Sequence, residues 1–267
     1  MLLRAFTPAA LACVLAMPFG AAAAQGFRYA PGTRQYRLTV QARITQTVMG
    51  QSNDINMSSG QKFTMTLANQ AADTLAMSAT IDSIAQDMGQ LGPVPGMEDL
   101  VGQKVSALLS PAGRYYAETT KPTDSIPALA GVASQLEHIL PYIRVVPAAG
   151  VAWTDTLSDT VSQSGLEVKR QVISTYTVAG DTTIAGARSW KINRVSSSTS
   201  TGSGMVQGQM ASMDGTSKGT GQLFIGHDGA FIGGTGTEDV VAKLSLPGAG
   251  VTYDVTTTAT TRIELVK

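Results

Sequence analysis

The sequence predicts a mainly β protein: a long, strongly curved antiparallel sheet, or half-barrel, of roughly eleven strands with one central amphipathic helix. Apolar and polar residues alternate with a period of two over residues 35–48 and again over 251–266, about three times a common strand length. Short polar or glycine-containing turns separate further alternating runs between them. A strand of about sixteen residues spans ~50 Å. A sheet of that length buries its apolar face most readily by twisting and curling around it.

The N-terminus predicts a cleaved signal peptide over residues 1–24, followed by a single β-rich half-barrel domain over 25–267. A basic residue precedes an apolar run that Pro18 interrupts, and Ala22 and Ala24 fit an A-x-A cleavage site. The alternative is a membrane anchor, but the run is too short to cross ~30 Å of hydrocarbon. We therefore expect a periplasmic or extracellular protein that is not membrane-spanning.

Composition excludes several classes of function. Cys13 is the only cysteine, so the mature chain can form no disulfide and no thiolate site. Lipidation at Cys13 is disfavoured because Ala10 stands where a lipoprotein signal needs a branched apolar residue. The chain has 19 basic and 19 acidic residues and no basic stripe. Nucleic acid is therefore not an expected partner, because phosphate binding needs many Lys and Arg contacts.

The first half of the mature chain predicts an antiparallel meander. A polar turn at 50–54 follows the first strand, and a second polar break at 58–61 precedes the next one. The loop at 89–102 is rich in Gly and Pro and contains one expected helical turn at 97–100. Residues 103–119 predict a strand, a turn at 111–113 and a returning strand.

The expected helix divides the chain nearly in half, within residues 125–143. Ser125 can cap it, Pro127 fits its first turn, and Pro141 ends or kinks it. Its apolar residues fall at three- and four-residue spacing: Leu129, Val132, Ala133, Leu136, Leu140 and Ile143.

The second half predicts strands almost throughout, with a break at 216–218 and a turn at 226–230. Two hairpins echo each other: in both, turn residues precede a glycine, one further residue and an aromatic side chain. The echo aligns Gly113 with Gly229 and Tyr115 with Phe231. Either tight turns simply require glycine at these positions, or the chain contains a duplicated half-domain.

The sequence offers little catalytic chemistry. Residues 215–219 match G-x-S-x-G, but the hydrolase elbow needs a strand, a sharp turn and a helix, and no helical pattern follows. A hairpin loop explains those glycines better. Only His138 and His227 could serve a triad, and neither belongs to a zinc-binding spacing. We expect no catalytic residue, no metal site and no cofactor, hence no enzyme.

Methionine is the more informative residue type, because it is flexible and common on adaptable apolar binding surfaces. Several methionines lie in strand segments, where ordinary core filling is the competing interpretation. The hypothesis is that three of them line a cavity with neighbouring apolar residues. The candidate ligand-binding residues are Leu38, Val40, Met57, Phe63, Met65, Leu75 and Met77.

The order of features resembles an uncharacterised secreted bacterial family: signal peptide, long strands, an SPAG hairpin, a helix, the segment GVAWTDT and Gly/Thr-rich strands. The half-barrel of that family is similar to periplasmic lipoprotein carriers of the Lol type. The resemblance implies an apolar cavity between sheet and helix that holds acyl chains. The carriers hold a lid closed with an arginine, a role that no arginine of this sequence is assigned.

Two functions follow as expectations. The first is an exported non-enzymatic protein that binds or carries a lipid or a lipoprotein acyl chain in an apolar cavity. The alternative is a structural or interaction module that docks a protein or glycan partner through its sheet. A large continuous cavity would favour the carrier, and a filled core with an exposed apolar patch would favour the module.

Overall fold

The computed structural model describes residues 26–89, 92, 96–118, 135–136, 139–163, 165–184, 186–206 and 208–266. Eleven antiparallel strands form one sheet in the order β5-β4-β3-β2-β1-β11-β10-β9-β8-β7-β6. The strands are β1 (Gly32–Val48), β2 (Gln51–Ala71), β3 (Thr74–Asp87), β4 (Lys104–Leu109), β5 (Tyr115–Glu118), β6 (Ala152–Gln163), β7 (Leu166–Ile184), β8 (Ala187–Val206), β9 (Gln209–Gly226), β10 (Phe231–Leu246) and β11 (Val251–Leu265). Among the described residues there are also two short 3₁₀ turns, η2 (Glu98–Leu100) and η3 (Pro247–Ala249).

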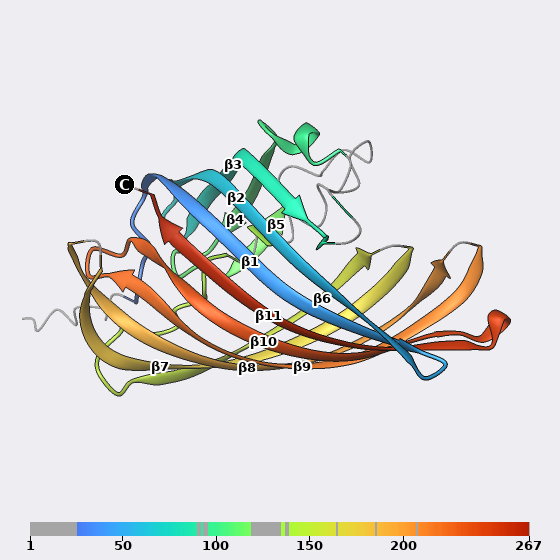
Figure 1. The fold of residues 1–267 in the computed structure, drawn as a ribbon. Helices are drawn as coiled ribbons and strands as arrows, with labels where there is room; N and C mark the ends of the chain where they lie inside the picture. The colour runs from blue at the N-terminus through green and yellow to red at the C-terminus, as the bar shows by residue number, and fades with distance from the viewer. Residues whose placement is uncertain are drawn as a thin grey trace, which may run out of the picture.

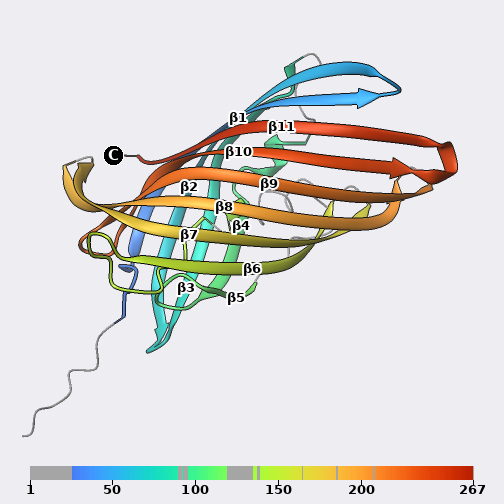
Figure 2. The same ribbon diagram turned by 90° about the horizontal axis from the view of Figure 1, so that it is seen from below.

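The two long alternating segments of the sequence, β1 and β11, lie side by side in the middle of the sheet (Figure 2). They pair without interruption from Tyr36 opposite Leu265 to Val48 opposite Tyr253. The sheet thus consists of two five-strand meanders, β1–β5 and β6–β10, joined through β11. In Figure 1 the long strands bow and their ends rise, so the sheet forms a trough. The predicted mainly β half-barrel of about eleven strands is confirmed.

Two predicted strand breaks are wrong. Residues 58–61 lie within the 21-residue strand β2, and residues 216–218 lie within β9. Polar residues did not end these strands because they alternate between the two faces as apolar residues do. In β9, for example, Ser217 is buried while Thr216 and Lys218 are exposed.

The described residues do not support the predicted central helix. Most of the segment assigned to it, residues 125–134 and 137–138, lies outside the described residues, and only 135–136 have helical conformation. Residues 139–143 are irregular, although Leu140 and Ile143 were expected on the apolar helix face. Tertiary hydrogen bonds hold this stretch: the Pro141 carbonyl accepts a bond from the Tyr29 hydroxyl, and the Ile143 amide donates to Ala112.

The core fills one end of the trough, on the concave side of the sheet that we call the inner face. Inner-face side chains of β1–β4 and β6–β10 pack there against residues 27–29, 136 and 139–143 and against η2. Tyr29 and Tyr36 are fully buried, and their hydroxyls donate to the carbonyls of Pro141 and Phe231 at 2.6 and 2.8 Å. Buried polar groups need such partners, so these two bonds fix how the irregular segments close this end.

The two echoing turns have the same hydrogen bonds. In the β4–β5 turn the Gly113 amide donates to Ser110, and the Ser110 amide to Arg114. In the β9–β10 turn the Gly229 amide donates to Gly226, and the Gly226 amide to Ala230. Each turn joins the fourth and fifth strands of its meander, which agrees with a duplicated half-domain as well as with the common need of tight turns for glycine.

Candidate functional site

The candidate site is the part of the inner face that continues past the core. Its half-buried apolar side chains, which we call the open strip, belong to neither cluster of buried apolar residues in the described chain. The open strip consists of Ile44, Val48, Ile55, Met57, Val240, Val251, Tyr253 and Val255.

Strand alternation and register place the open strip on the same face as the core. Ile44 lies eight residues after Tyr36 in β1, an even number that returns to the same face. It stands opposite Ile55 of β2 and Thr257 of β11, and Thr257 in turn stands opposite Val240 of β10. The strip therefore runs across four neighbouring strands as one surface.

Small residues form the floor of the trough on β8, β9 and β10. Gly215 and Gly219 of β9 face serines of β8. A Cβ on Gly215 would lie 2.7 Å from Ser200 Oγ, and a Cβ on Gly219 would lie 2.8 Å from Ser196 Oγ. A larger side chain at either glycine would require the facing serine to rotate away. Inward glycines of this kind mark sharp bends of sheets, which explains why the glycine-rich stretch of the sequence is strand.

A chain of hydroxyl hydrogen bonds crosses this floor. Ser217 lies 2.7 Å from Ser198 and donates to Glu238 Oε1 at 2.6 Å. Ser217 is the serine of the G-x-S-x-G match, so that pentapeptide lies mid-strand and is neither an elbow nor the expected hairpin loop. His227 follows ten residues later along the same strand direction, roughly 33 Å away at ~3.3 Å per residue. The two residues do not form a dyad.

An ion pair stands at the edge of the trough. Arg170 of β7 donates through Nε and Nη2 to both carboxylate oxygens of Asp159 on the edge strand β6, at 3.1 and 2.6 Å. A hollow of about 530 Å³ on the outer face of the same strands is lined mainly by hydroxyl, amide and Lys side chains, among them Thr160, Lys169 and Gln171. The ion pair with Asp159 explains why Arg170 can stand among the apolar inner-face residues of β7.

The seven predicted ligand-binding residues fall into two groups in the structure, five in the core and two outside it. Leu38, Phe63, Met65, Leu75 and Met77 are all packed in the core, at most 2% exposed.

The other two predicted residues lie at the open part of the inner face. Val40 packs against the core from its rim, and Met57 belongs to the open strip. A hollow of about 410 Å³ beside Ala42 and Met57 opens on the outer face, where Gln41, Asn56 and Asp87 line it. Ligand contact by these seven residues remains a prediction. The sequence did not lead us to predict Gln61 or the β11 members of the open strip, which are Val251, Tyr253 and Val255. Continuing the period-two pattern through the supposed break at 58–61 would have placed Gln61 on the inner face.

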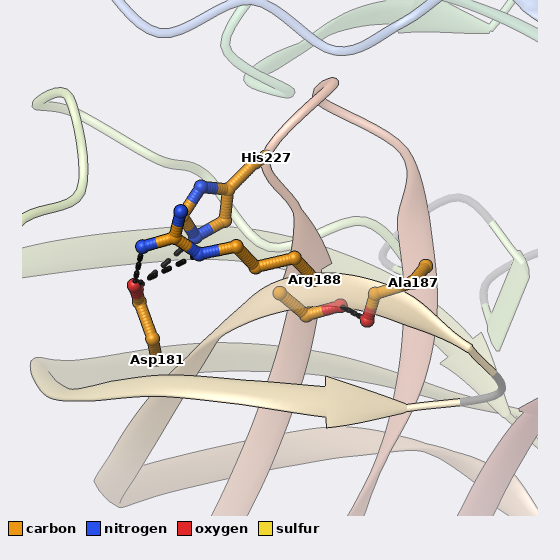
Figure 3. A network of polar contacts seen from close by, with 5 residues as sticks. Asp181, Ala187, Arg188 and His227 are labelled. Carbon is orange, nitrogen blue, oxygen red and sulfur yellow. Dashed lines mark hydrogen bonds and ion pairs between the residues drawn. The ribbon is translucent and has the colours of Figure 1, made fainter.

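The one described histidine belongs to a polar network at the core end of the sheet (Figure 3). Arg188 and His227 both bond to the Asp181 carboxylate, and the His227 ring stacks on Trp190 at 4.4 Å. The hydrogen bond from Arg188 is the main reason that the pKa of Asp181 lies below its usual value, with a smaller effect of His227. The His227 amide donates to the Arg188 carbonyl. The network thus ties the β9–β10 turn to the β7–β8 hairpin.

The described residues contain no group of three or more His, Cys, Asp or Glu side chains placed to hold a metal ion. Nor do they contain a helix of the length and apolarity that crossing a membrane requires.

No protein family model and no curated protein sequence matches this chain. Weak similarities exist among solved structures. Pseudomonas aeruginosa OccK2 (OpdF), in complex with glucuronate, is 6% identical with a TM-score of 0.34, over 91% of this chain and 100% of that one. Salmonella typhi OmpF, in complex with daunomycin, is 8% identical with a TM-score of 0.28, over 87% and 98%. A DUF1329 family protein from Desulfovibrio piger is 6% identical with a TM-score of 0.15, over 83% of each chain. Similarities this low carry no argument about function.

Proposed function

We propose that this is an exported, non-enzymatic protein that binds or carries a lipid-like molecule along the open strip of its half-barrel. The observation that supports the proposal is the open strip itself: apolar inner-face side chains of four adjacent strands that stay half-buried beyond the core. Covering such a surface with an acyl chain removes apolar area from water, which is favourable by about 25 cal/mol per Å².

The outer face supports the alternative, docking of a partner through the sheet, less well. Most of its exposed apolar side chains are separated from one another by hydroxyl groups on the neighbouring strands; the exception is Met205 of β8, which stands opposite Met210 of β9. Val195 stands between Thr175 and Thr220, and Val241 between Thr216 and Thr256. Scattered apolar residues of this kind are normal on protein surfaces.

Two neighbouring valines of β10 provide a matched test. Val240 belongs to the open strip, whereas Val241 points to the outer face and is 59% exposed. Binding of a fluorescent dodecanoyl probe should weaken roughly tenfold in Val240→Gln, because burying a valine side chain contributes about 1.5 kcal/mol or more. Val241→Gln, the same chemical change on the opposite face, should bind the probe as the unaltered protein does.

Equal binding by both variants would rule out the open strip as the contact surface. Native mass spectrometry of gently purified protein gives an independent measurement. Finding neither a co-purifying lipid nor probe binding would contradict the proposed function as a whole.

A further inference from the structure

One polar side chain is buried at the rim of the core without full hydrogen bonding. Gln61 of β2 is only 3% exposed. Its Nε2 donates to Gln135 Oε1 at 2.9 Å, but no described donor lies within hydrogen-bond distance of its Oε1. It is the one buried side-chain oxygen or nitrogen of the described residues in this condition.

This arrangement is costly for folding alone. An amide oxygen buried without a partner loses its hydrogen bonds to water and regains nothing, which destabilises the folded chain. A leucine of similar size would avoid that cost at a position surrounded by apolar residues. Along β2 the next inner-face residue is Phe63, and across the sheet Gln61 stands opposite Leu38 and Ile84. The oxygen is therefore an acceptor held in an apolar setting.

Gln61 also lies where the core gives way to the open strip. The next inner-face positions along β1 and β2 are Val40 and Ser59, both half-buried, and then Ala42 and Met57. Met57 is the first member of the open strip on β2. A ligand that covers the open strip and ends beside Met57 would bring its head group to Gln61.

We propose that the lipid-like ligand carries a hydrogen-bond donor, an amide N–H or a hydroxyl, at the head of its acyl chain, and that Gln61 Oε1 accepts this bond. The inference rests on the proposed function and narrows its ligand class. It favours N-acyl amides and acyl compounds with a free hydroxyl over fatty-acid anions and esters, which have no donor at that position. A buried, otherwise unpaired acceptor discriminates strongly, because a ligand without the donor leaves it unsatisfied.

The test compares two probes that differ by one N–H. N-methyldodecanamide has a single amide hydrogen, and N,N-dimethyldodecanamide has none. Their dissociation constants would be measured by isothermal titration with the full chain. We expect the N–H compound to bind about fivefold more tightly, as one net hydrogen bond predicts.

Two variants assign the difference to Gln61. In Gln61→Leu the two probes should bind equally, and the variant should unfold at a denaturant concentration no lower than that of the unaltered chain. In Gln41→Leu, which changes an exposed glutamine of β1, the fivefold difference should persist.

Equal binding of both probes by the unaltered chain would overturn the inference and leave the proposed function standing, with an internal water as the partner of Gln61. The comparison uses the unaltered chain, so it holds even if a variant does not fold. Absence of binding by either probe would overturn the proposed function and the inference with it.

Discussion

Burial of the Tyr36 hydroxyl makes the stability of the fold depend on pH. Its ring stacks on Phe63 at 5.5 Å and its hydroxyl donates to Phe231. Burial raises the pKa of Tyr36 from 10.0 to about 12, because the charged phenolate is poorly solvated inside the protein. The folded chain therefore holds this proton more tightly than the unfolded chain does.

The resulting stability is fully present below pH 10 and is lost as the pH rises from 10 to 12. Two pKa units correspond to about 3 kcal/mol. We expect the free energy of unfolding in urea to fall over this range, and Tyr36→Phe to remove part of the fall. At neutral pH the variant should lose about 1 kcal/mol, the net value of one hydrogen bond. Burial also raises the pKa values of Tyr29 and Tyr176, which account for the rest of the fall in stability. An identical pH profile for both chains would contradict the assignment to Tyr36.

At the scale of the element, the β4–β5 turn depends on one glycine for both its backbone and its packing. Gly113 has φ of +93°, and a Cβ there would lie 2.6 Å from the Tyr29 ring and 2.8 Å from the Pro141 carbonyl oxygen. Gly186, in the β7–β8 turn, has φ of +85° but open space around it. The two positions therefore separate backbone strain from steric overlap.

Alanine at both positions should show that separation in the free energy of unfolding. Gly186→Ala should cost about 1–2 kcal/mol, the cost of a left-handed conformation for a residue with a Cβ. Gly113→Ala should cost a further 1–3 kcal/mol, because Tyr29 and Pro141 must shift. Equal losses in chemical denaturation would show that the irregular segment can move away freely.

At the scale of the whole molecule, β11 is the strand that makes one sheet out of two meanders. It pairs with β1 on one side and β10 on the other, each over most of its length. A chain that ends at Gly250 should therefore lose the cooperative unfolding transition measured by circular dichroism. Without β11, the hydrogen-bonding edges of β1 and β10 would be exposed. A chain that ends at Leu265 should retain the transition. A single unchanged transition in the shorter chain would mean that the meanders fold without β11.

Much of this architecture could be predicted because a strand facing water on one side records its orientation in every second residue. The segments that became β1 and β11, the SPAG turn and the helical turn at 98–100 are predictable on that basis. The continuous strands β2 and β9 were not, since serine, glycine and glutamine at inward positions look like turn residues when the neighbouring strands are unknown. Of the candidate site, the sequence predicted only Met57 in the open strip and Val40 at the rim of the core.

By itself the sequence determined the sheet, its approximate number of strands and which side chains share a face, because alternation is a local property of the chain. Tertiary structure alone decided where the core ends and the open strip begins, because that boundary depends on which distant residues cover the sheet. Residues 27–29, 136 and 139–143 cover one end, and no periodicity along the strands records their position. The same reason hid Gln61, whose importance lies in the partner that its buried oxygen lacks.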